Sequence, residues 1–147
     1  MSNILISLFD HSGNQSRPYR ENGWEVVQID IKHGKDVMDF NPATFIAEYL
    51  HRPMTYHLPV IGILAPIPCT CYAISGNRHK KKRLLNGEFE ESQKLVQKTK
   101  DIIEWFRNSG CLEFWMVENP MSDIQEEIID KLVFKLLFCP IPNNIHV

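Results

Sequence analysis

Short, mostly apolar runs alternate along the chain with segments whose apolar residues recur at helical spacing. The runs have few polar positions, a pattern typical of strands that are buried on both faces of a parallel sheet. The predicted strands are residues 4–9, 24–31, 60–64 and 112–117. The clearest helix is 88–108, whose stripe consists of Leu95, Val96, Thr99, Ile102, Ile103 and Phe106.

Turn residues and helix caps fill the segments between these strands. A turn over residues 10–14 leads into a short helix with Pro18 in its first turn. Residues 34–38 are predicted to form a short third strand or the entry to one. Asn41 is a good N-cap for a helix that begins at Pro42. One face of that helix carries Phe45, Ile46, Tyr49 and Leu50.

The last part of the chain continues the same alternation. Ser109 and Gly110 end the long helix, and Ser122 with Gln125 forms a capping box for another helix. Residues 133–138 are predicted to be a last strand, and residues 140–147 a tail. We therefore expect one α/β domain over residues 1–139, with a mostly parallel sheet and helices on both faces.

Composition narrows the class of protein. A chain of 147 residues with a hydrophobic fraction of 44% is typical of one globular domain. Its net charge of -2 excludes a generally basic nucleic-acid binder. A local basic run remains, at residues 78–83. No apolar run approaches the roughly 18 residues that cross a bilayer, and the N-terminus lacks the pattern of a signal peptide. The spacing of the four cysteines fits neither a disulfide scaffold nor paired zinc hooks, which favours a reducing, cytoplasmic setting with free thiols.

Polar residues follow the predicted strands where each strand ends. The turn at residues 10–14 and the carboxylate of Glu118 come directly after a strand. The thiol of Cys69 follows the turn at Pro66 and Pro68 that ends the strand 60–64. Because the carboxyl ends of parallel strands meet at one edge, we expect these groups to lie close together. Asp30 follows the first turn by about twenty residues, as an acid does in a nucleotide-binding βαβ unit. A candidate nucleophile followed by a polycationic loop suggests chemistry on a polyanion.

In order and approximate spacing, several short motifs across residues 4–122 resemble those of the DNA cytosine-5 methyltransferase family, in particular its short phage-type members. These are Leu8-Phe9-Asp10-His11-Ser12-Gly13, then Asp30, Asp36, Pro68-Cys69-Thr70 and Glu118-Asn119-Pro120. The family usually has glycine where His11 stands. The resemblance implies a three-layer Rossmann-like fold that uses S-adenosylmethionine, and nothing after Pro120 resembles the family's later motifs. Either the enzyme is minimal or its C-terminal part is lost. In the second case we expect a fold that is incomplete at its C-terminus, with a second copy or a partner chain as the candidate to complete it.

The resemblance also assigns roles to residues. Cys69 would be the nucleophile that adds to carbon 6 of cytosine and makes carbon 5 reactive toward the methyl group of S-adenosylmethionine. Glu118 would hold ring nitrogen N3 of a flipped base, and Asn119 would orient it. The residues implied in cofactor binding are Phe9, Asp10, Ser12, Gly13, Asp30, Asp36 and Pro68. Those implied in contacts with DNA phosphates are Ser75, Asn77, Arg78, Lys80, Lys81, Lys82 and Arg83.

Each of these residues also has a simpler interpretation. A lone Cys69 is often a small buried apolar residue, Asp30 is a good helix cap, and Glu118 is placed to cap the helix near Ser122. A basic run of this kind is more often a solvated loop than a DNA-binding segment. A zinc site from Cys69, Cys71 and His79 has no standard spacing, and no metal ligand set is assigned. The interval from Cys71 to Arg78 is one residue too long for the loop of a cysteine phosphatase. The alternative function is a catalytically silent methyltransferase relative that binds DNA, nucleotide or a protein partner.

Overall fold

The computed structural model of the chain describes residues 3–52, 57–68 and 80–118. Its centre is a four-stranded parallel sheet with the strand order β2-β1-β3-β4. The strands are β1 (Asn3–Leu8), β2 (Glu25–Ile29), β3 (Val60–Pro66) and β4 (Leu112–Glu118). The predicted helix from Ser122, the predicted strand at 133–138 and the tail lie outside the described residues.

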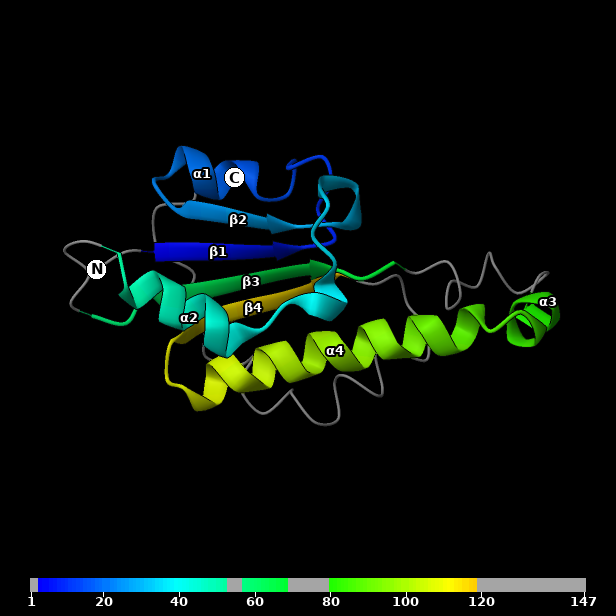
Figure 1. Cartoon of the computed structure of the whole chain (residues 1–147). Helices are drawn as coiled ribbons and strands as arrows, with labels where there is room; N and C mark the ends of the chain where they lie inside the picture. Colours follow the sequence, from blue (N-terminus) through cyan, green and yellow to red (C-terminus); the bar gives the residue numbers. More distant parts are fainter. Residues whose placement is uncertain (1–2, 53–56, 69–79, 119–147) are drawn as a thin grey trace.

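Helices lie on both faces of the sheet, as the alternation of elements predicts (Figure 1). The helices are α1 (Arg17–Glu21), α2 (Pro42–Leu50), α3 (Lys80–Leu85) and α4 (Glu88–Asn108), with the short 3-10 helices η1 (Ile31–His33) and η2 (Val37–Asp39). Helix α1 lies on one face, while α2 and α4 lie on the other. The described part is therefore an α/β fold with an all-parallel sheet, compatible with a Rossmann-like architecture. None of the described helices is both long enough and apolar enough to cross a membrane.

The direction of the chain reverses at the middle of the sheet. From β1 the chain moves outward to β2, and it then returns to place β3 against the opposite side of β1. This makes the carboxyl ends of β1 and β3 a topological switch point, where open α/β sheets gather their ligands. The segments that leave these two ends are the turn after Leu8 and the segment that leads from Pro66 to Cys69.

The main core fills the space between the sheet and helices α2 and α4. Alternate residues of β1 and β3 point to this face, and Phe106 of α4 is fully buried against them. The core residues from the strands are Ile4, Ile6, Leu8, Ile29, Ile61, Ile63 and Ala65. Helix α4 adds Val96, Ile102 and Ile103, which belong to its predicted stripe. The period of the stripe therefore correctly identifies the buried face of this helix.

Aromatic side chains build the contact of the opposite face with α1. Tyr19 of α1 stacks on Phe114 of β4 at 5.5 Å between ring centroids, and Trp24 meets the same ring edge-on at 5.6 Å. The Phe114 ring covers Gly62 of β3, where a Cβ atom would lie only 2.4 Å from Cζ of Phe114. Gly62 is therefore required by the close packing of the Phe114 ring against β3.

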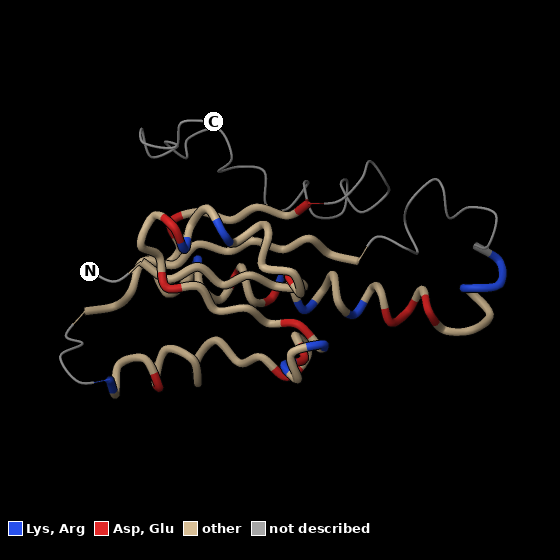
Figure 2. The backbone as a smooth tube through the Cα atoms, turned by 90° about the horizontal axis from the view of Figure 1, so that it is seen from above, with Lys and Arg blue, Asp and Glu red and all other residues tan. Residues whose placement is uncertain are grey.

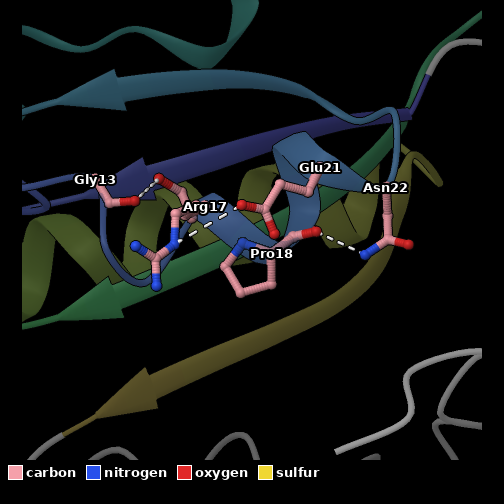
Figure 3. A network of polar contacts seen from close by, with 6 residues as sticks. Gly13, Arg17, Pro18, Glu21 and Asn22 are labelled. Carbon is pink, nitrogen blue, oxygen red and sulfur yellow. Dashed lines mark hydrogen bonds and ion pairs between the residues drawn. The ribbon is translucent and has the colours of Figure 1, made fainter.

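Local hydrogen bonds set the bounds of the short helix α1 (Figure 3). The backbone N–H of Arg17 donates to the carbonyl of Gly13 at 2.9 Å, so the turn after β1 leads directly into the helix. At the other end the side-chain amide of Asn22 donates to the carbonyl of Pro18 at 2.7 Å. Arg17 and Glu21 form an exposed ion pair at 3.9 Å, which adds little stability.

Three local predictions were wrong. Residues 34–38 are not a strand: Asp36 caps η2 by accepting a hydrogen bond from the backbone N–H of Met38, and Gly34 ends η1 with a left-handed backbone at φ 72°. The basic run is not a loop throughout, because residues 80–85 form α3. Leu50 is 41% exposed, so the apolar face of α2 is narrower than its spacing predicts.

Candidate active site

The carboxyl ends of the four strands meet at one edge of the sheet (Figure 1). In the strand register Leu8 lies beside Ile29, and Pro66 lies beside Glu118. The segments that follow β1, β2 and β3 therefore begin at the same edge at which β4 ends. Four of the residues singled out from the sequence lie at this edge: Asp10, Asp30, Pro68 and Glu118.

The carboxylate of Asp10 is buried and holds the loop of residues 10–16 together. Its Oδ2 accepts hydrogen bonds from the hydroxyls of Ser7 at 2.9 Å and Ser16 at 2.8 Å. Its Oδ1 accepts from the backbone N–H of Gly13 at 2.8 Å. Because both oxygens are occupied and the side chain is 4% exposed, the carboxylate of Asp10 organises the loop rather than facing a ligand.

The backbone of this loop has two unusual positions. Phe9 is the first residue after β1 and has φ 57°, which is uncommon for an aromatic residue. Its partly buried ring packs against the core. Gly13 has φ 71°, and a Cβ there would lie 3.1 Å from Nε2 of Gln28. The glycine is therefore explained by the backbone turn and by packing against β2, and Gln28 in turn donates to the carbonyl of Asp10 at 2.8 Å.

A second contact joins the loop to the segment after β2. The Nε2 atom of His33 lies 2.9 Å from the carbonyl oxygen of His11, and the two imidazole rings are 5.1 Å apart between centroids. Both histidines are exposed, as is Ser12 between His11 and Gly13. The hydroxyl of Ser12 accepts a weak hydrogen bond from the backbone N–H of Asn14 at 3.3 Å.

Asp30 caps η1 directly after β2. Its Oδ1 accepts from the backbone N–H of Lys32 at 2.8 Å, whereas its Oδ2 has no hydrogen bond to the described part of the chain. The next residue, Ile31, is apolar, but its side chain is 72% exposed where the chain leaves β2. Asp30 is half-buried and offers a carboxylate oxygen to a ligand hydroxyl, and the exposed side chain of Ile31 offers an apolar surface to a flat ring. Asp36 forms no hydrogen bond with Asp30 or with loop 10–16 in the described ranges, and its carboxylate caps η2.

Glu118 is the last residue of β4 and reaches the loop after β1. The side-chain amide of Gln15 donates to Oε2 of Glu118 at 2.5 Å, across 103 positions of sequence. This hydrogen bond links the predicted cofactor loop to the predicted base-binding carboxylate. Pro68 is exposed at the end of the segment after β3. The two residues that would complete the catalytic group, Cys69 and Asn119, lie outside the described residues.

The basic run extends beyond the same edge of the sheet. Helix α3 lies on the side to which the strands point, at the far end of α4 (Figures 1 and 2). Lys81 and Lys82 are exposed, whereas Arg83 is paired with Glu88 at 3.7 Å. The first turn of α4 carries Glu88, Glu90 and Glu91, which offset part of the positive charge. The side chains of Ser75, Asn77, Arg78 and Lys80 are outside the described set.

Several residues that form this edge were missed by reasoning from the sequence. Ser7 offered a signal, because it is the one polar residue inside the run 4–8 and stands three positions before Asp10. Gln15 and Ser16 offered no such signal, since polar residues are ordinary in a turn.

Among the described residues no group of three or more His, Cys, Asp or Glu side chains is placed to hold a metal ion. Comparison of the chain with protein-family profiles, with curated proteins and with solved structures finds no match.

Proposed function

We propose that this protein transfers a methyl group from S-adenosylmethionine to carbon 5 of cytosine in DNA, at the carboxyl edge of its sheet. The observation that carries the proposal is the convergence at that edge. Four different strands end at a shared edge. Loop 10–16, Asp30 and the segment that leads to Cys69 follow three of them, and Glu118 is the last residue of the fourth. Their order matches the motif order on which the resemblance to cytosine-5 methyltransferases rests.

The edge fits the nucleoside part of the cofactor. Oδ2 of Asp30 accepts no hydrogen bond from the described part of the chain and would accept from a ribose hydroxyl. The exposed side chain of Ile31 would pack against the adenine ring. When bound, S-adenosylmethionine would supply the methyl group. Asp10 would contribute indirectly, by fixing the backbone of loop 10–16 beside the cofactor.

The chain's own residues would activate the base. Glu118 has one carboxylate oxygen held by Gln15, and the other would accept from N3 of a protonated cytosine ring. A ring polarised in this way accepts the sulfur of Cys69 at carbon 6, which makes carbon 5 nucleophilic. Transfer of the methyl group to carbon 5 would break its bond to the sulfonium sulfur and leave S-adenosylhomocysteine. Loss of the carbon-5 proton to a water molecule would then expel the sulfur of Cys69 as the thiolate. The target base must leave the helix stack to reach these groups.

Exposed cations beyond the edge support DNA as the substrate. Lys81 and Lys82 are exposed residues of α3, and this helix lies on the side where the strands end. Phosphate contacts of this kind give affinity that falls steeply with salt. Because Arg83 is paired with Glu88, we expect Lys81 and Lys82 to contribute more of that affinity than Arg83.

The test is methyl transfer to duplex DNA and covalent trapping by a duplex that contains 5-fluorocytosine. Fluorine at carbon 5 does not leave as a proton does, so the adduct with Cys69 persists. We expect the wild type to transfer and trap, and Cys69→Ala to do neither while it unfolds at the same temperature. Cys111→Ala is a matched control, because Cys111 is a buried free thiol directly before β4, at the opposite end of that strand from Glu118.

Two outcomes would overturn the proposal. Methyl transfer retained in Cys69→Ala would refute the role of the thiol. Binding of DNA by the wild type without transfer or trapping would instead favour a catalytically silent relative. Glu118→Gln should reduce transfer more than DNA binding, and an equal loss of both would indicate a structural role for that carboxylate.

A further inference from the structure

One hydrogen bond determines how Glu118 is held at the end of β4. The Nε2 amide of Gln15 donates to Oε2 of Glu118. Glu118 is exposed, and within residues 3–52, 57–68 and 80–118 this is the hydrogen bond recorded for its side chain. A glutamate at the end of a strand otherwise samples many rotamers, so a single donor has a large effect on where the carboxylate points.

Gln15 is itself held by the residues around it. Ser16, the next residue, is buried and bonded through its hydroxyl to Asp10 at 2.8 Å. Gly13, two positions earlier, is bonded through its backbone N–H to the same carboxylate. The backbone on both sides of Gln15 is therefore anchored to a buried group, and the Gln15 amide extends from a fixed base.

We propose that Gln15 is a positioning residue, which orients the carboxylate of Glu118 toward the substrate base from the loop after β1. The inference rests on the proposed function and names a group that the resemblance does not assign. Gln15 occupies Oε2 of Glu118 and leaves Oε1 to accept from the ring of the base. Gln15 acts through Glu118 and takes no part in bond making or breaking.

The first test separates orientation from binding of the cofactor. Gln15→Met keeps the length of the side chain and removes the donor. We expect kcat for methyl transfer to fall about tenfold, the loss of about one charge-assisted hydrogen bond in the transition state. KM for S-adenosylmethionine should stay within about twofold, because Gln15 is expected to act on the base rather than the cofactor. Gln93→Met is the matched control, since it makes the same substitution at an exposed glutamine of α4, outside loop 10–16.

A second test exchanges the two partners. Gln15→Glu brings two carboxylates together and should lower the urea midpoint of unfolding. Adding Glu118→Gln should restore the midpoint, because the amide at position 118 then donates to the carboxylate at position 15. The double variant should remain inactive, because the carboxylate has moved to the other side of the contact. The urea midpoint therefore tests the contact, and the split between kcat and KM in Gln15→Met tests its role in positioning.

The outcomes distinguish this inference from the proposed function. A wild type that transfers methyl groups, with an equally active Gln15→Met, would refute the positioning role and leave the proposed function intact. No recovery of the midpoint in the double variant would refute the contact itself. A wild type that never transfers methyl groups would overturn the proposed function, and the positioning role with it.

Discussion

Removal of the Asp10 carboxylate tests whether this buried group holds the loop after β1. In Asp10→Ala the hydroxyl of Ser7 and the backbone N–H of Gly13 lose the acceptor they have in the structure, while the hydroxyl of Ser16 keeps the Gly13 carbonyl at 3.3 Å. A buried donor left without an acceptor costs about 1–3 kcal/mol, so two cost about 2–6 kcal/mol. Relief of the buried charge offsets part of this cost, and we expect about 3 kcal/mol of lost stability.

The assay is urea unfolding, monitored by tryptophan fluorescence. The slope of the unfolding free energy against urea concentration is compared between variants. A loss of 3 kcal/mol corresponds to a drop in Tm of about 6–12 °C for a chain of this size. Asp36→Ala is the matched control, because Asp36 accepts from one backbone N–H at a half-buried cap and should lose only about 1 kcal/mol. If the two variants lose the same stability, Asp10 is an ordinary cap and the reasoning fails.

The interaction can also be measured by a double-mutant cycle between Asp10 and Ser7. In the wild-type background Ser7→Ala should cost about 1 kcal/mol, because it removes a hydrogen bond. In the Asp10→Ala background the same substitution should be neutral or stabilising, because the Ser7 hydroxyl is then an unsatisfied buried donor. An equal cost in both backgrounds would contradict the contact.

Three other substitutions test the packing and the caps by the same urea assay. Gly62→Ala should cost about 1–3 kcal/mol, because the added Cβ overlaps the Phe114 ring, and Phe114→Leu should recover part of that loss. Equal losses from Gly62→Ala with and without Phe114→Leu would locate the strain elsewhere. Asn41→Ala should cost about 1 kcal/mol, because its side chain accepts from the backbone N–H groups of Ala43 and Thr44 at the start of α2. Phe106→Ala should cost about 3–5 kcal/mol, because the ring is fully buried, and a loss below 1 kcal/mol would contradict that burial.

Hydrophobic spacing was sufficient to predict the parallel sheet and its long helix. The run at residues 4–9 predicts β1 because a strand covered on both faces has almost no polar positions. Helix α4 begins and ends where its stripe predicts, and its geometry also buries Lys100, which is 5% exposed despite its charge. Lys100 lies four positions after Val96 and three before Ile103, so its place on the helix decides its burial.

The finer structure of the site could not be predicted from spacing. Residues 34–38 were predicted as a short strand or the entry to one, but the side-chain acceptor of Asp36 and the left-handed backbone of Gly34 favour 3-10 turns. The contact between Gln15 and Glu118 depends on strand order, because β1 and β4 are not neighbours. Nothing in a single sequence gives the order of the strands, and a contact across 103 positions therefore needed the fold.

We propose that the carboxyl edge of the sheet binds S-adenosylmethionine through Asp30 and Ile31. The most direct measurement is the thermal unfolding of the wild type and of Asp30→Ala, each with and without S-adenosylhomocysteine. At about one hundred times the dissociation constant a ligand adds about 2.7 kcal/mol to the stability of the native state. The account predicts a rise in the Tm of the wild type of about 5–11 °C and a much smaller rise for Asp30→Ala. An unchanged Tm of the wild type at millimolar ligand, or equal rises in both proteins, would contradict it.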